Sequence, residues 1–254
     1  MEIETTLAIC AETPDSIVRE VANLTRIGRF VFTPRPEKAI RDVYLELPGG
    51  ELRSRGCGLR LRSVDGEQLI TLKGRAARVA GGGLRRDETE LEWSREGMGE
   101  IVDHLAELGV LLDLPDPARE WEDPETIVSR MGFVADQIRS TVRRPRDVSP
   151  DRAASLIVAE LVIDSVVYFL QAGDVRHHEI EVEAKGTGTV EDIQEVSNTL
   201  LGYLPGSLRE WHFGKRATGR AVANILAERG SPEILSPSGD LLPGSYDQIL
   251  VKLQ

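Results

Sequence analysis

The sequence predicts an α+β fold in which an antiparallel sheet or barrel packs against amphipathic helices. Three observations predict it. Apolar and polar side chains alternate with a period of two in a series of short segments, which is the spacing of strands with one buried face. Turns rich in Gly, Pro and Asp separate these segments. Amphipathic segments with a helical period lie between them and need an apolar surface to cover.

The expected strands follow one another along most of the chain. They cover residues 3–9, 43–47, 58–63, 68–74, 88–94, 137–144, 156–164, 165–171 and 177–186. The last of them alternates most regularly, because Glu179, Glu181 and Glu183 are separated by Ile180 and Val182. In an extended chain this alternation makes one face a row of carboxylates and the other face apolar.

Helical periodicity marks the intervening segments. They cover residues 13–24, 98–112, 124–133, 189–201 and 216–230. Two of them begin with residues that are typical of helix starts. Pro14 follows Thr13 at the first helical position, and Thr189 with Asp192 has the spacing of a capping box.

The C-terminal region differs in composition from the rest of the chain. Residues 231–254 are rich in Pro, Gly and Ser, and they predict a loop-like tail with one short strand at 249–253. We expect residues 1–230 to form a single domain that includes a helical segment at 97–133. The tail then follows this domain.

Composition narrows the class of protein. The 254 residues carry a formal net charge of −11, which argues against stable nucleic-acid binding. No apolar run approaches the ~20 residues of a membrane helix, and the first residues do not resemble a signal peptide, so we expect a cytoplasmic protein without a membrane partner. Cys10 and Cys57 predict free buried thiols. His177 and His178 predict surface positions, since neighbours in a strand face opposite sides and do not easily hold one metal ion.

Charge of a single sign recurs on the polar faces of several expected strands. Residues 88–94 and 177–186 carry rows of Glu, whereas Arg60 lies two residues before Arg62. Like charges repeated along an exposed face repel one another, and helices packed outside a closed sheet would turn these faces inward. A charged lumen needs counter-charges. Carboxylates bind divalent cations and Arg or Lys bind phosphates, so a polyphosphate with Mg²⁺ or Mn²⁺ satisfies both kinds of row.

The order of the charged motifs is itself a pattern. EIETT, with Glu2, Glu4 and Thr6, comes first, and VYLELPGGELRSRGCGLRLRS follows. The later motifs are ITLKG, ETELE, QIRSTVRR, LVIDSV, EIEVEAKG and FGKRATGRA. This ordered set resembles the CYTH domain of triphosphate tunnel metalloenzymes, a family that includes thiamine, inorganic and RNA triphosphatases and class IV adenylate cyclases. The resemblance extends from residue 2 to about residue 220.

The resemblance implies an eight-stranded antiparallel β-barrel, a triphosphate tunnel, with helices packed outside. It also implies a triphosphatase that depends on Mg²⁺ or Mn²⁺ and hydrolyses tripolyphosphate, thiamine triphosphate or a nucleoside triphosphate. The residues that it assigns to catalysis are Glu4, Lys73 and Lys215. Those that it assigns to substrate binding are Arg60, Arg62, Lys73, Arg139, Arg143, Lys185 and Lys215. Those that it assigns to the metal are Glu2, Glu4, Glu90, Asp164, Glu181 and Glu183.

One residue departs from the family pattern. Thr6 stands where the family's first strand carries a lysine that is associated with hydrolysis. Thr6 has no charge and a shorter reach, and Lys185 is a candidate replacement. A triphosphate- or nucleotide-binding protein with weak or no turnover is therefore one alternative, and a class IV-type adenylate cyclase is another. The sequence leaves open the substrate and whether the protein is a monomer or a homodimer.

Overall fold

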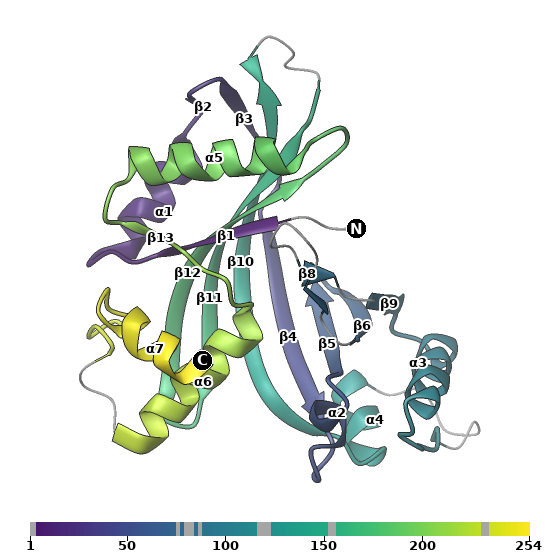
Figure 1. The fold of residues 1–254 in the computed structure, drawn as a ribbon. Coiled ribbons are helices and arrows are strands. Elements are labelled where there is room, and N and C mark those ends of the chain that lie inside the picture. The colour runs from purple at the N-terminus through teal and green to yellow at the C-terminus, as the bar shows by residue number, and fades with distance from the viewer. Residues whose placement is uncertain are drawn as a thin grey trace. The chain divides into compact units, whose positions relative to one another are not determined.

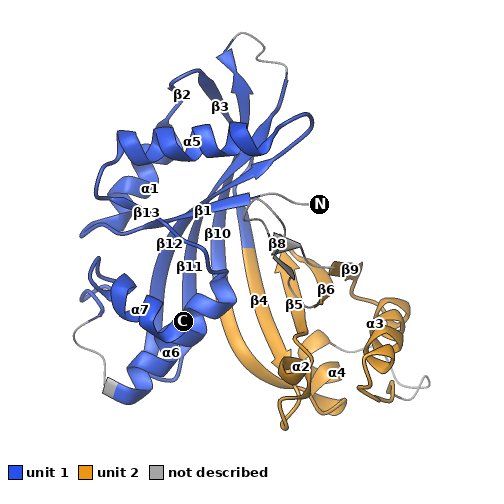
Figure 2. Cartoon of the chain, in the orientation of Figure 1, with its two compact units in different colours: residues 1–39, 140–254 blue, residues 40–139 orange. Residues whose placement is uncertain are grey.

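The computed structural model describes residues 4–74, 77–78, 84–85, 88–115, 123–151, 156–229 and 234–254. Its elements are helices and antiparallel strands, which confirms the α+β class (Figure 1). The chain divides into two compact units (Figure 2). Unit 1 consists of residues 1–39 and 140–254, and unit 2 consists of residues 40–139. No described helix is long and apolar enough to cross a membrane.

The described residues of unit 1 form a sheet and four helices. Its strands are β1 (Glu4–Ile9), β2 (Arg26–Ile27), β3 (Phe30–Pro34), the part of β10 (Val134–Pro150) from Ser140 onward, β11 (Ala159–Leu170), β12 (Gly173–Ala184) and β13 (Leu208–Glu210). Its helices are α1 (Pro14–Asn23), α5 (Val190–Tyr203), α6 (Lys215–Arg229) and α7 (Ser245–Leu253). β12 lies between β1 and β11 and is antiparallel to both.

The central strands of unit 1 have one apolar and one polar face. Leu7 lies opposite Ile180, and Thr6 lies opposite Glu181. The apolar face packs in one core with α1 and α5, which lie over it (Figure 1). Burial of each such Leu or Ile side chain stabilises the fold by roughly 2 kcal/mol. The predicted capping box of Thr189 is present at the start of α5.

α6 and α7 pack in a second core of unit 1, against residues of β1 and β12. This core includes Ala8, Trp211, Val222 and Ile249. The prediction of a short strand at 249–253 is wrong, because these residues belong to α7. Tyr246 and Ile249 are three residues apart, so both lie on the buried face of this helix.

Unit 2 contains its own strands and core. Its elements are β4 (Lys38–Glu46, from Ile40 onward), α2 (Glu51–Ser54), β5 (Gly58–Val64), β6 (Glu67–Lys73), β7 (Ala77–Arg78), β8 (Leu84–Arg85), β9 (Glu88–Glu92), α3 (Arg95–Glu107), α4 (Pro124–Arg130) and residues 134–139 of β10. Leu59 and Ile70 of the strands pack with Met98 of α3 and Ile127 of α4. The helical segment predicted at 97–133 thus provides α3 and α4.

The strand order corrects the prediction in several places. The order is β13-β1-β12-β11-β10-β4-β5-β6-β9, and β3 joins β10 and β2 to make eleven strands. The eight-stranded barrel is therefore not confirmed. Residues 156–171, expected as two strands, instead form the single strand β11 from Ala159. β10 is longer than residues 137–144, and β2 and β3 were not predicted.

The turn after β12 permits a test of this packing. A Cβ atom on Gly188 would lie 1.7 Å from the carbonyl oxygen of Val158, whereas a Cβ on Gly202 in α5 would meet nothing within 4 Å. Gly188→Ala should lower the free energy of unfolding by several kcal/mol through displaced backbone. Gly202→Ala, the matched control, should raise it by about 0.5–1 kcal/mol. Chemical denaturation measures both, and equal effects would contradict the described turn.

Candidate active site

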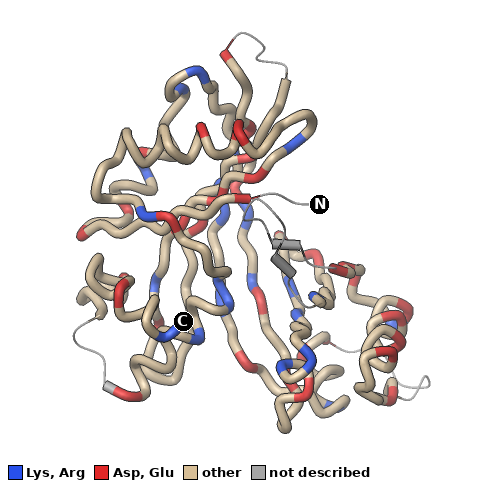
Figure 3. Tube along the Cα trace, viewed as in Figure 1, with Lys and Arg blue, Asp and Glu red and all other residues tan. Residues whose placement is uncertain are grey.

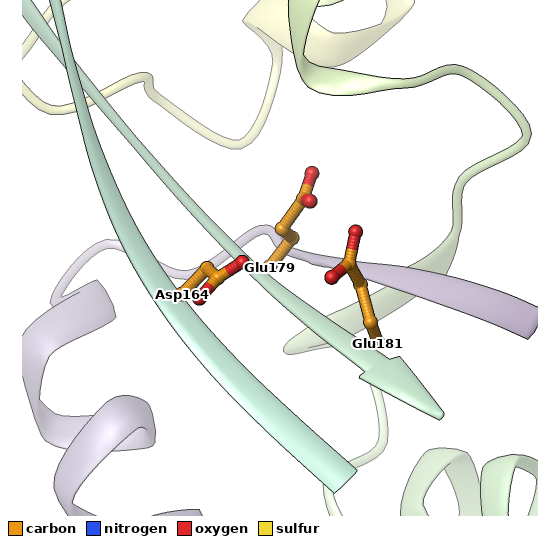
Figure 4. Close-up of side chains that lie close together, drawn as sticks. All are labelled: Asp164, Glu179 and Glu181. Carbon is orange, nitrogen blue, oxygen red and sulfur yellow. The ribbon is translucent and has the colours of Figure 1, made fainter. Parts of the chain in front are cut away.

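Three carboxylates converge on the polar face of β11 and β12. Asp164 lies opposite Glu179, and Glu181 follows two residues later on β12, so all three side chains project from one face. One oxygen atom from each lies within 4.8 Å of those of the other two (Figure 4). Asp164 and Glu179 are 0% and 1% exposed, and Glu181 is partly buried. We call these three residues the carboxylate cluster.

Two cations pair with the carboxylate cluster. The Nζ atom of Lys215 lies 2.9 Å from Asp164 and 2.6 Å from Glu181, and it also contacts Glu179. Arg143 donates to both oxygens of Asp164, at 3.0 and 2.6 Å, and to Glu181 at 2.9 Å. Burial acts to lower the pKa of Lys215, but the three negative charges raise it well above its usual value. Lys215 therefore remains protonated.

Glu4 joins the same face through β1. It lies opposite Glu183, two pairs along the strands from Thr6 and Glu181. Glu4 is exposed as a residue, but loss of hydration of its carboxyl is the main cause that raises its pKa to about 7, and the charge of Glu181 is the second. The three carboxylates of the cluster carry one more negative charge than Lys215 and Arg143 neutralise, and an ionised Glu4 adds another. This surplus of charge on oxygen ligands suits a hard divalent cation.

The histidines next to the carboxylate cluster are buried, so the predicted surface positions are wrong. His177 is 0% exposed and His178 is 4% exposed. Nε2 of His177 lies 2.8 Å from Glu179, and Nε2 of His178 lies 3.2 Å from Asp240. Burial lowers the pKa of His178 despite its bond to Asp240. Tyr246 and Asp240, which contact the two rings, come from the C-terminal segment, and no local sequence pattern connects this segment to β12.

Unit 2 carries the opposite arrangement, with three arginines around one buried carboxylate. Asp42 is 1% exposed. Arg62 donates to it at 2.7 Å and Arg139 at 2.8 Å, and the Nε atom of Arg60 lies 3.8 Å away. Burial acts to raise the pKa of Asp42, but the bond from Arg62 and the charges of the arginines hold it well below its usual range. We call these four residues the arginine cluster.

Further polar groups surround Arg60. Its Nη2 atom donates at 3.0 Å to both Thr71 and Glu90, while Lys73 pairs with Glu88 at 2.7 Å. The buried Nε–H of Arg60 has no hydrogen-bond partner among the described residues. A buried donor in that state costs about 1–3 kcal/mol, which an anion that accepts from it would offset. Figure 3 shows acidic and basic residues interleaved along the strands of each unit.

The structure distributes the predicted site residues between the two units. In unit 1 it brings together Glu4, Arg143, Asp164, Glu181 and Lys215. In unit 2 it brings together Arg60, Arg62, Lys73, Glu90 and Arg139. Lys185 instead pairs with Glu183 at 2.7 Å. Glu2 lies outside the described residues.

Sequence reasoning missed two members of these clusters. The resemblance assigns Glu181 and Glu183 to the metal and leaves out Glu179, which belongs to the same row of carboxylates. Asp42 was not considered, although it lies two residues before Tyr44 in the same strand. The period of two that placed their neighbours on the polar face places both of them there as well.

Comparison with known proteins connects this chain to one family. A family model described as the CYTH domain matches residues 19–208, which is most of the chain. No curated protein matches the sequence. A Hippeastrum protein, described as a candidate adenylyl cyclase with a dominant triphosphatase activity, aligns with a TM-score of 0.52 and 19% identity over 87% of this chain and 96% of its own.

Two further solved structures align less closely. A candidate adenylate cyclase from Bacillus halodurans has a TM-score of 0.43 and 18% identity over 80% of this chain and 89% of its own. A protein from Pyrococcus horikoshii has a TM-score of 0.42 and 16% identity over 90% of this chain and 100% of its own. At such identities, the likeness to the Hippeastrum structure supports the fold alone.

The raised pKa of Glu4 predicts a pH dependence of stability. The folded state disfavours ionised Glu4, so its contribution is fully present below the unfolded pKa near 4.5 and is lost as the pH rises through about 7. Glu4→Gln should therefore gain in melting temperature relative to the wild type between pH 5 and pH 8. Glu12→Gln, at an exposed position, is the control and should show a constant difference. A constant difference for Glu4→Gln as well would contradict the partial desolvation of this carboxyl beside Glu181.

Proposed function

Since this chain belongs to the CYTH domain family, we propose that it is a divalent-metal-dependent triphosphatase that acts on inorganic or organic triphosphates. The observation that carries the proposal is that the polar strand faces hold two clusters of charged residues, one with excess negative charge and one with excess positive charge. The carboxylate cluster has fewer cations than anions, and the arginine cluster has the reverse. Hydrolysis of a metal-bound triphosphate needs carboxylates that bind the metal ion and cations that bind the phosphates.

The residues of unit 1 fit a metal ion. All ligand atoms would be carboxylate oxygens, which Mg²⁺ and Mn²⁺ prefer. We assign the ion to Glu4, Glu181 and Glu183, with Asp164 beside them. Bound there, it would neutralise phosphate oxygens and make a coordinated water more acidic. Asp164 also holds Lys215 at 2.9 Å.

The cationic side chains would bind the phosphates. Arginine gives paired, directional hydrogen bonds to phosphate oxygens, and buried arginines are already oriented before the substrate arrives. We assign this role to Arg60, Arg62, Arg139, Lys73, Arg143 and Lys215. Lys185 is a weaker candidate, because Glu183 already pairs with it at 2.7 Å.

The reaction itself requires positioning and neutralisation of charge. Water attacks the terminal phosphorus, the bridging P–O bond breaks, and tripolyphosphate gives orthophosphate and pyrophosphate. Cations that are fixed around the phosphates stabilise the charge that develops on the leaving oxygen. The triphosphatase activity described for the Hippeastrum protein supports this choice among the activities of the family. The cytoplasmic location that the sequence predicts remains part of this proposal.

Phosphate release tests the proposal. We expect the wild type to hydrolyse at least one of tripolyphosphate, thiamine triphosphate and nucleoside triphosphates with Mg²⁺ or Mn²⁺, and to lose this activity in a chelator. Arg60→Ala should lower kcat/KM by about a hundredfold, the cost of losing one fixed charge-stabilising donor. Arg26→Ala, which removes an exposed arginine paired with Asp151, should leave it unchanged. Absence of release from every substrate with either metal would refute the triphosphatase.

Thr6 favours a second candidate, a triphosphate-binding protein with little turnover. Its strand register places it opposite Glu181, where a lysine would add a third cation to the carboxylate cluster. Thr6→Lys should raise turnover while calorimetry shows tripolyphosphate binding little changed. If the wild type already turns over rapidly and Thr6→Lys is no faster, the binding-only candidate is excluded. Cyclic nucleotide and pyrophosphate among the products would instead indicate a cyclase.

A further inference from the structure

A buried chain of hydrogen bonds connects the C-terminal helix to the carboxylate cluster. The hydroxyl of Tyr246 in α7 lies 3.0 Å from Nδ1 of His177 and 3.2 Å from the carbonyl oxygen of Ile9. Nε2 of His177 lies 2.8 Å from one oxygen of Glu179, and the other oxygen contacts Nζ of Lys215. Tyr246, His177 and Glu179 are each at most 1% exposed.

The direction of the hydrogen bond from His177 follows from the state of Glu179. Glu179 is 1% exposed and its other oxygen contacts the ammonium group of Lys215, so it is the carboxylate of a buried ion pair. An ionised carboxylate only accepts hydrogen bonds, so Nε2 of His177 donates. Since Tyr246 engages the other ring nitrogen, the imidazole is held in one orientation.

Tyr168, which stacks on His177, also binds the backbone of Lys215. Tyr168 donates its hydroxyl hydrogen to the carbonyl oxygen of Lys215 at 2.8 Å. The ring of Tyr168 stacks on His177, with centroids 6.4 Å apart. Both ends of Lys215, its carbonyl and its ammonium, are thus fixed by buried groups of this network.

We propose that Tyr246 and His177 are positioning residues, which hold Glu179 and through it Lys215 in the geometry that grips phosphate. Helix α7 then helps to position the residues of the site. The consequence for catalysis rests on the proposed function, whereas the hold on Lys215 does not. A packing role alone would make the hydroxyl of Tyr246 unimportant for Lys215.

Other residues of the C-terminal segment make contacts that do not involve this network, and they provide a control. Asp240 bonds to His178, whose other ring nitrogen lies 3.1 Å from Ser165; none of these three is bonded to the carboxylate cluster in the described structure. Ser245, the residue before Tyr246, is 1% exposed and donates to the carbonyl oxygen of Leu242. Ser245→Ala therefore removes one buried hydroxyl from the same helix without touching the network.

Lysine labelling tests the proposal without any need for activity. The chain has five lysines: Lys38, Lys73, Lys185, Lys215 and Lys252. The folded protein would be treated with N-acetoxysuccinimide, and acetylation of each lysine would be quantified by mass spectrometry. Lys215 should be protected in the wild type and in Ser245→Ala. It should be acetylated up to about tenfold faster in Tyr246→Phe, which is the upper end of what one intramolecular hydrogen bond contributes. The other four lysines are internal standards.

Substitutions of His177 extend this test. His177→Gln keeps an amide donor for Glu179, so it should leave Lys215 better protected than His177→Leu does. With tripolyphosphate, Tyr246→Phe should raise KM while Ser245→Ala does not. Unchanged labelling of Lys215 in Tyr246→Phe, or an equal rise in Ser245→Ala, would overturn the positioning role. A wild type without phosphate release would refute the proposed function alone, because the labelling comparison would still decide this inference.

Discussion

The structure of unit 1 depends on the ion pairs between Lys215 and three carboxylates that are largely removed from water. An ionised carboxylate in a protein interior is very unfavourable unless a cation and hydrogen bonds compensate it. Asp164 and Glu179 are almost fully buried, and Lys215 with Arg143 compensates them. Loss of either cation would leave a buried charge without its partner, which typically costs about 3–5 kcal/mol. The register of β11 and β12 and the start of α6 at Lys215 both satisfy this requirement.

The arginine cluster of unit 2 meets the same requirement with the signs reversed. One carboxylate, Asp42, holds three arginines that would otherwise repel one another. Neither cluster is neutral, and the two have surpluses of opposite sign. Stability alone does not require such surpluses, since well-packed apolar residues can replace buried ion pairs without loss of stability. The excess charges are therefore the physical reason for assigning a metal ion and phosphates to the polar strand faces. Ion pairs with a purely structural role would not need them.

Much of this arrangement was predictable from strand periodicity. Alternation placed Glu181 and Arg60 on polar faces, and the ordered motifs indicated a family that the match over residues 19–208 confirms. The contacts that could not be predicted join residues far apart in sequence. Tyr246 and Asp240 bury His177 and His178, and a two-residue spacing alone cannot show which opposite charges will meet. The tail was expected to be a loop because its Pro, Gly and Ser residues outweighed the apolar spacing of α7.

The central claim is that the polar strand faces bind a metal ion and a chain of phosphates. A crystal structure with Mn²⁺ and tripolyphosphate, in which anomalous scattering locates the manganese, tests it most directly. The account predicts manganese coordinated by Glu4 and Glu181 of unit 1, and phosphate oxygens in contact with Lys215. Manganese only at exposed carboxylates, with no phosphate beside Lys215, would contradict the account.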